Sequence, residues 1–141
     1  MLIRKATYDD LFDVLELYSQ QDIDNGQILE LNNAKTIFDK IKLYPDYNIY
    51  VAEIDNKIVG TFTLAIMDNL AHMGSKSGLI EDVVVLQSLQ GKGIGKKMMQ
   101  FAIEACKEKS CYKVCLSSNL KRKNTHIFYK KLDLRNMDIV F

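Results

Sequence analysis

The sequence predicts an α/β fold, and three patterns carry this prediction. An apolar, β-branched run from Leu79 to Leu86 has the composition of a strand that is buried on both faces. Residues 47–54 and 57–67 are predicted to be two further strands, joined by the turn-forming pair Asp55-Asn56. Apolar residues recur at helical spacing from Met98 to Cys106, directly after a glycine-rich turn. Strands and helices therefore alternate along the chain.

The N-terminal third is predicted to hold one strand and two helices. Leu2 to Ala6 alternates apolar and polar residues, which indicates a strand. Thr7 is expected to cap the next helix, because Asp10 stands at the third position and favours the positive helix end. Asn32 or Asn33 is expected to cap a second helix that runs to about Leu43, before Pro45.

The C-terminal third is predicted to continue the alternation. A helix is expected from about Gly91 to Lys109, followed by a strand from Tyr112 to Ser117. The polar and basic stretch from Ser118 to Asn124 is expected to form a loop. A short helix over Thr125 to Leu132 and a last strand within Leu134 to Phe141 complete the prediction.

Length and composition indicate an ordinary globular protein. The chain has 141 residues, which suits one domain over residues 1–141, and 48% of them are hydrophobic. No apolar run reaches about eighteen residues, and the first residues lead into a strand rather than a signal peptide, so we expect a cytoplasmic protein with no membrane contact. The three cysteines are expected to be free thiols, and their spacing fits no zinc motif, so no metal is expected.

The net charge of +1 hides an uneven distribution of charge. Through Ser75 the chain has 6 basic and 12 acidic residues, whereas from Lys76 onward it has 13 basic and 6 acidic ones. The basic half suits a polyanionic cofactor, and the acidic half either suits a cationic acceptor or is simply solvated charge. The chain has no basic stripe with interleaved aromatic residues, so nucleic acid is not expected as a partner.

The glycine-rich turn Gln90-Gly91-Lys92-Gly93-Ile94-Gly95 predicts an anion site. Its glycines let the backbone approach a bulky anion, and the free N–H groups of the following helical turn point at that anion. Lys96 and Lys97 add positive charge. The turn lacks the Ser or Thr of a P-loop and the spacing of the dinucleotide fingerprint. The plain alternative is a turn that merely joins a strand to a helix.

The spacing Gln/Arg-x-x-Gly-x-Gly/Ala, filled by Gln90, Gly93 and Gly95, resembles a loop of the GNAT superfamily of N-acetyltransferases. In that family the loop holds the pyrophosphate of acetyl-CoA. The segment Phe128-Tyr129-Lys130-Lys131-Leu132, at the usual distance, adds to a resemblance that covers about Val51 to Leu134. It implies a GNAT-like acyl-CoA N-acyltransferase fold, with a mixed, mostly antiparallel sheet flanked by helices, and acetyl-CoA as co-substrate.

Two groups within the family are especially similar. The segment Ile80-Glu81-Asp82-Val83-Val84-Val85 resembles glucosamine-6-phosphate N-acetyltransferases. The segment from Leu116 to Arg122, together with His126, resembles aminoalkylphosphonate N-acetyltransferases. Both groups act on amines that carry a phosphorus oxyanion, and Lys121, Arg122 or Lys123 could bind that anion.

Acetyl transfer to an ammonium needs a base for the amine and an acid for the departing thiolate. Glu81 is an ionisable residue within an apolar strand, and a half-buried carboxylate can accept a proton near neutral pH. Asp82 is expected to project to the opposite face, because side chains alternate along a strand. The resemblance implies that Glu81 is the base and Tyr129 the acid, since a phenol ionises near pH 10 and can donate to a thiolate. Otherwise Glu81 is a strand-end ion-pair partner and Tyr129 a packing residue.

The resemblance also implies which residues hold acetyl-CoA. The backbone of Val83, Val84 and Val85 would bind the pantetheine arm like an added strand, and a backbone N–H there would hold the oxyanion. The loop residues Gln90, Gly91, Lys92, Gly93, Ile94, Gly95 and Lys96 would bind the pyrophosphate. Arg122 stands where the family often has Asn, and Asn119 and His126 are further cofactor candidates.

The activity that these residues predict is acetyl-CoA-dependent N-acetylation of the primary amine of a small molecule, by direct transfer. The alternatives are a protein or peptide N-acetyltransferase and a non-catalytic sensor that binds acyl-CoA. A sensor would keep the glycine loop without needing Glu81 or Tyr129. A homodimer is possible, and the short C-terminus leaves its arrangement open.

Overall fold

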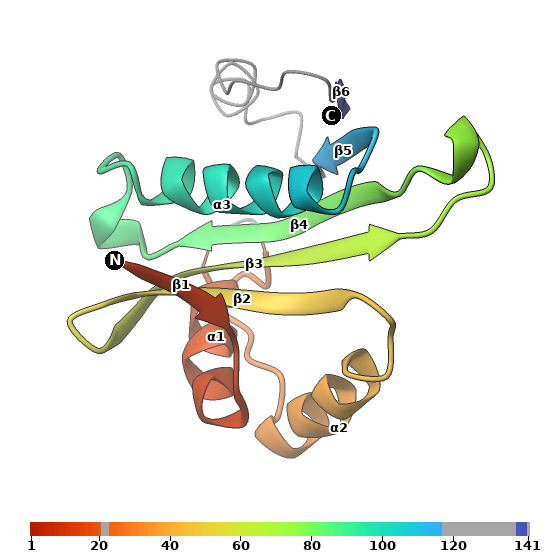
Figure 1. Ribbon diagram of the computed structural model, residues 1–141. Coiled ribbons are helices and arrows are strands. Elements are labelled where there is room, and N and C mark those ends of the chain that lie inside the picture. The colour runs from red at the N-terminus through yellow and green to blue at the C-terminus, as the bar shows by residue number, and fades with distance from the viewer. Residues whose placement is uncertain (21–22, 117–137, 141) are drawn as a thin grey trace.

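The computed structural model describes residues 1–20, 23–116 and 138–140, and in them a six-stranded sheet lies between helices (Figure 1). The strands follow one another across the sheet in sequence order: β1 (Leu2–Lys5), β2 (Tyr47–Ile54), β3 (Lys57–Met67), β4 (Ser77–Val85), β5 (Lys113–Leu116) and β6 (Asp138–Val140). The pairs from β1 to β4 are antiparallel, whereas β4–β5 and β5–β6 are parallel. The predicted mixed, mostly antiparallel α/β sheet is therefore confirmed.

The helices cover both faces of the sheet. In Figure 1, α3 (Ile94–Glu108) lies on one face, and α1 (Leu11–Tyr18) and α2 (Leu31–Ile41) lie on the other. Three short 3₁₀ helices complete the described elements: η1 (Tyr8–Asp10), η2 (His72–Gly74) and η3 (Gln87–Leu89). Within the described residues, no helix is long and apolar enough to cross a membrane.

The main core lies between α3 and the sheet. The predicted stripe of α3 is buried, and it packs against side chains of β3 and β4 that include the fully buried Phe62 and Ile80. Two glycines bring the helix close to these strands. A Cβ atom at Gly78 would lie 2.5 Å from the Sγ of Cys106, and one at Gly60 would lie 2.8 Å from the Sδ of Met98. The sheet can approach α3 this closely only because both positions lack a side chain.

Thr7 is an N-cap as predicted, but it caps the 3₁₀ helix η1, which leads into α1, and the N-cap of α1 itself is Asp10. The Asp10 carboxylate accepts a hydrogen bond from the Thr7 backbone N–H at 2.7 Å and another from the Thr7 hydroxyl at 3.1 Å. It also receives two bonds from the Arg4 guanidinium, at 2.6 and 3.0 Å. These bonds hold the pKa of the buried Asp10 carboxyl below its usual range, the Arg4 bond being the largest cause. The turn therefore ties β1 to the start of the helix.

The cap of the second helix differs from the prediction. Helix α2 begins at Leu31, and the Glu30 carboxylate caps it by accepting from the backbone N–H groups of Asn32 and Asn33, both at 3.0 Å. The two asparagines lie inside the first turn and donate to the cap instead of providing it. The helix also ends at Ile41, two residues before the expected end.

The other predicted boundaries fall close to the observed ones. Strands β2 and β3 match the predicted ranges, and Asp55 and Asn56 form the turn between them with φ values of 50° and 64°. The three cysteines are free thiols. The predicted loop 118–124 and helix 125–132 lie outside the described residues.

Candidate active site

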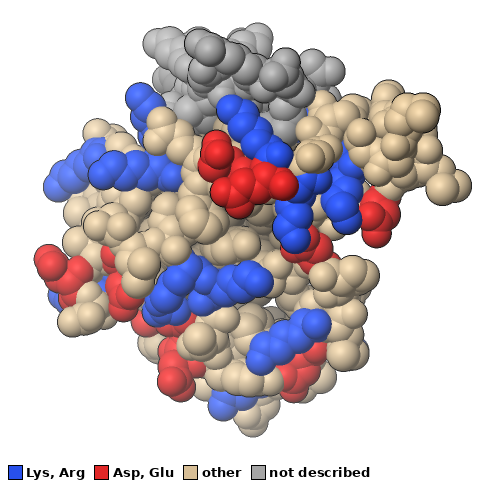
Figure 2. All heavy atoms as spheres, viewed as in Figure 1, with Lys and Arg blue, Asp and Glu red and all other residues tan. Residues whose placement is uncertain are grey.

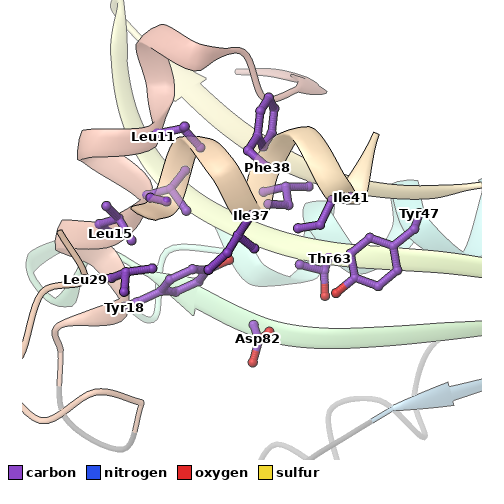
Figure 3. A pocket seen from close by; sticks show the side chains of 13 residues that line it. Leu11, Leu15, Tyr18, Leu29, Ile37, Phe38, Ile41, Tyr47, Thr63 and Asp82 are labelled. Atoms are coloured by element: carbon purple, nitrogen blue, oxygen red, sulfur yellow. The ribbon is translucent and has the colours of Figure 1, made fainter. Parts of the chain in front are cut away.

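A pocket of about 170 Å³ lies between α1, α2 and the face of the sheet opposite α3 (Figure 3). Of the thirteen described residues that line it, nine have hydrocarbon side chains: Leu11, Val14, Leu15, Leu29, Ala34, Ile37, Phe38, Ile41 and Ile49. The other four are Tyr18, Tyr47, Thr63 and Asp82; Figure 3 shows Tyr47, Thr63 and Asp82 on the strands, whereas Tyr18 comes from the end of α1. The pocket therefore has an apolar body and one polar wall.

A β-bulge in β4 brings Asp82 into this wall. Thr61 of β3 pairs with Val84 of β4, and Thr63 pairs with Glu81. A step of two residues on β3 therefore corresponds to a step of three residues on β4. Asp82 takes up the extra residue with φ of 52°, in the left-handed region where Asp is tolerated better than most residues. The expectation that Asp82 projects to the face opposite Glu81 is therefore wrong, because the bulge breaks the alternation on which it rested.

Glu81 belongs to the same face of the sheet. It is half-buried and stands directly opposite Thr63, whose side chain lines the pocket. Residues directly opposite each other in an antiparallel pair have their side chains on one face. The Thr63 hydroxyl donates to the Glu81 backbone carbonyl at 3.1 Å, which anchors the strand beside the bulge. Two consecutive carboxylates are thus directed to the pocket side of β4.

The polar wall has an unusual electrostatic environment. Loss of hydration raises the pKa of the Asp82 carboxyl, although part of its side chain is exposed, and the negative charge of Asp24 adds to this rise. Burial also raises the pKa values of the Tyr18 and Tyr47 phenols, and the charge of Asp82 is the second cause for both. Both phenols therefore stay protonated at neutral pH and remain hydrogen-bond donors beside the carboxylate.

The glycine loop, residues 90–95, follows β4 after the short helix η3. Gly91 and Gly93 have φ values of 78° and 85°, and Gly93 is the N-cap of α3. Both are exposed, and a Cβ atom at either position would have nothing within 4 Å. The positive φ angles turn the chain from strand to helix and leave the N-terminus of α3 open to a ligand. Figure 2 shows basic side chains over this end of the molecule.

Two glutamine side chains fasten this loop to β4. The amide groups of Gln20 and Gln90 both donate to the Val85 carbonyl, at 3.0 and 3.2 Å. The Gln20 side-chain oxygen in turn accepts from the Gln87 backbone N–H at 2.9 Å. Gln90, the first residue of the predicted cofactor motif, therefore positions the loop against the strand. The role of Gln20 had no signal in the sequence.

Strand β4 has an open edge beside the loop. Its parallel pairing with β5 runs only from Ser77 to Ile80 on the β4 side. Beyond Ile80, the strands that the structure describes give β4 no partner on that side, so β3 is the one described strand that pairs with the predicted pantetheine segment 83–85, and the Val85 carbonyl also accepts from Gln20 and Gln90. An extended ligand arm can add to such an edge as an extra strand. Figure 1 shows that α3 begins near this end of β4 and runs alongside the strand.

Four of the predicted site residues lie outside the described part of the chain: Tyr129, Asn119, Arg122 and His126. The structure brings together the others, since the carboxylates, segment 83–85 and the glycine loop follow one another along β4 and into α3. Tyr18, Tyr47 and the pocket position of Asp82 were missed. The sequence offered one signal for the position of Asp82, which is the acidic pair Glu81-Asp82 directly before segment 83–85. Strict alternation of side chains along β4 was assumed, and this assumption leaves no place for a bulge.

The model of the acetyltransferase (GNAT) family matches residues 11–133. The glucosamine 6-phosphate N-acetyltransferase of Arabidopsis thaliana is 34% identical over 105 residues, which are 72% of this chain and 68% of that protein. Its crystal structure superposes with a TM-score of 0.79 at 30% identity, covering 94% of this chain and 91% of that one. The aminoalkylphosphonate N-acetyltransferase of Salmonella typhimurium is 30% identical over 62% of this chain and 56% of its own length.

The chain belongs to the GNAT family of acetyltransferases. It is therefore an N-acetyltransferase by family, and acetyl-CoA is the family's co-substrate. The resemblance inferred from the glycine loop is confirmed.

Proposed function

We propose that this protein transfers an acetyl group from acetyl-CoA to the primary amine of a small molecule. The observation that carries the proposal is the small size of the pocket, which ends at the bulge of β4, the strand that leads into the glycine loop. A cavity of about 170 Å³ suits a small acceptor, whereas a peptide would need an extended groove. The named acceptors of the two relatives, glucosamine 6-phosphate and aminoalkylphosphonates, are also small amines.

Acetyl-CoA is proposed to lie along the open edge of β4, with its pyrophosphate at the glycine loop. The backbone of segment 83–85 would hold the pantetheine arm, and the N–H groups around Gly93 and Gly95 would hold the pyrophosphate. Lys92 and Lys96 are exposed beside the loop and supply positive charge. Asn119, Arg122 and His126 remain proposed contacts of the cofactor.

Glu81 is proposed as the base and Tyr129 as the acid. The acceptor's ammonium loses a proton to Glu81, directly or through water, and the lone pair of the resulting amine attacks the thioester carbon. A backbone N–H of segment 83–85 holds the oxyanion, and the tetrahedral intermediate collapses as the C–S bond breaks. Tyr129 gives its proton to the departing CoA thiolate, and the attacking nitrogen loses its second proton to the resulting Tyr129 phenolate, directly or through water. The products are the N-acetylated amine and CoA.

Release of free CoA from acetyl-CoA, measured with small amines and with peptides, tests the proposed activity. We expect turnover with small amines and none above background with peptides. Binding of acetyl-CoA without turnover of any amine would contradict the proposal and favour the sensor. Tyr129→Phe should bind acetyl-CoA normally while turning over roughly 10²-fold more slowly, the usual scale for a lost general acid. Turnover within twofold of the wild type would remove Tyr129 from that role.

The role of Glu81 is tested by pH. Glu81→Gln cannot accept a proton, so its kcat/KM should be low near pH 7 and partly recover at high pH, where free amine forms without help. A residue that only positions the substrate would show a deficit that does not change with pH. Two parallel profiles of kcat/KM against pH for wild type and variant would exclude Glu81 as the base.

A further inference from the structure

We infer that the acceptor is a cationic amine with an apolar body, held in the pocket with its ammonium against Asp82, and that it carries no phosphate or phosphonate. This inference rests on the proposed function and narrows its acceptor. The relatives named above act on phosphorylated or phosphonylated amines, so the inference separates this chain from them.

The charges around the pocket favour a cation and repel an oxyanion. Among the described residues that line the pocket, Asp82 is the one that carries a charge, and none is lysine, arginine or histidine. A second carboxylate, Asp24, lies near enough for its charge to act on Asp82. Phosphate and phosphonate groups are bound by cationic side chains or convergent N–H groups. A primary ammonium pairs with Asp82 and gains further from the aromatic faces of Tyr18 and Tyr47.

The remaining lining favours an apolar body on that amine. Nine hydrocarbon side chains surround the space, and a cavity of about 150 Å³ lined in this way can hold a benzene ring. Two of these side chains, Leu29 and Ile37, are 43% and 46% exposed, so the apolar lining continues to the protein surface. A sugar or a short phosphonate would leave its polar groups against carbon, which costs free energy for every group left without a hydrogen bond.

The direct test compares acceptors by CoA release from the full chain with acetyl-CoA. The probes are 2-phenylethylamine, 2-aminoethylphosphonate and glucosamine 6-phosphate. We expect kcat/KM for 2-phenylethylamine to exceed each of the other two by at least tenfold. A smaller ratio, or a reversed one, would overturn the inference and leave the proposed N-acetyltransferase standing. Release from none of the amines, by a chain that binds acetyl-CoA, would overturn both.

Two substitutions test the role of Asp82. Asp82→Asn keeps the shape and tolerates the positive φ of this position, but it removes the charge. KM for 2-phenylethylamine should rise at least tenfold, while KM for acetyl-CoA stays within twofold. Asp55→Asn is the matched control, because Asp55 also has a positive φ, of 50°, and lies exposed in the β2–β3 turn. It should change neither value. Equal KM values for the amine in Asp82→Asn and wild type would overturn the proposed contact.

Adding a positive charge to the rim provides an independent readout. Ile37 is nearly half exposed, so Ile37→Lys can be accommodated without unfolding α2. The new ammonium should lower kcat/KM for 2-phenylethylamine about tenfold or more, and Ile37→Gln should lower it less. Equal losses in the two variants would show that charge does not matter at this pocket, and the inference would then fail.

Discussion

Changing Gly93 to Asp should weaken acetyl-CoA binding by charge, and Gly93→Asn isolates that effect. Asp and Asn have nearly the same shape, and both tolerate the left-handed backbone better than other residues do. A Cβ atom at Gly93 would meet nothing within 4 Å, so neither side chain disturbs the free protein by collision. Their difference in affinity for acetyl-CoA therefore reports the added negative charge at the N-terminus of α3.

The size of that difference follows from the position of Gly93. Its φ of 85° at the N-cap places a new carboxylate beside the N–H groups that would face the pyrophosphate. Two unit charges about 4–6 Å apart repel by about 3–4 kcal/mol at an effective dielectric constant of about 20. This repulsion corresponds to a Kd that is about a hundred- to a thousandfold higher for Gly93→Asp than for Gly93→Asn. Gly93→Ala, which has backbone strain without charge, serves as the third variant.

The assay is titration calorimetry of acetyl-CoA into each folded variant, at about 0.1 M and about 1 M salt. The Debye length falls from about 10 Å to about 3 Å over this range, so the gap between Asp and Asn should shrink at high salt. Thermal unfolding of each variant checks that the fold is retained. Equal affinities of Gly93→Asp and Gly93→Asn at low salt would refute the placement of the pyrophosphate at this loop.

Two further predictions concern stability. Gly78→Ala should cost about 1–3 kcal/mol, the range for overpacking a core, because its methyl group meets the Sγ of Cys106. Gly60→Ala should cost less, since it meets a flexible methionine, and adding Cys106→Ala to Gly78→Ala should recover part of the loss; urea midpoints measure these effects. Asp10→Asn should cost about 2 kcal/mol at pH 7. The pKa of Asp10 is lower in the folded protein, so its contribution to the free energy of unfolding is fully present above its unfolded pKa of about 4 and is lost as the pH falls through the lower folded value. The stability difference between Asp10→Asn and wild type should therefore disappear in acid. A difference that does not change with pH would contradict the ion pair.

The sequence predicts most of the sheet because its signals are local. Alternation and a two-residue turn determine β2 and β3, and an N-cap threonine with an acidic residue three positions later determines the start of the first helix. Glu30 was missed as a cap because its longer side chain is an uncommon choice, while two nearby asparagines are common ones. Residue type alone therefore favoured an asparagine as the cap of α2, whereas the structure uses Glu30.

The candidate site was only partly predictable, for a physical reason. The glycine loop is recognised from the spacing of glycines within residues 90–95, which is a local signal. The sequence alone therefore identifies Gly91 and Gly93 as turn residues. The pocket is formed by residues far apart in the sequence, such as Tyr18 and Asp82, and no local pattern indicates that they line the same space. The bulge depends on how β4 pairs with β3, so periodicity within β4 alone assigned Asp82 to the wrong face.

The closeness of Gly78 to Cys106 also restricts how β4 can pair during folding. A slip of β4 by two residues along β3 would keep its alternation, and Leu79 to Val85 offers similar apolar residues at either register. Such a slip would carry the large side chain of Ile80 into the place of Gly78, where even a Cβ atom would lie 2.5 Å from the Cys106 sulfur. A slip of one residue would turn the buried Ile80 toward the opposite face. The close approach of Gly78 to Cys106 therefore favours a single register of β4 on β3. This register also determines where the bulge lies and where it places the carboxylates of Glu81 and Asp82.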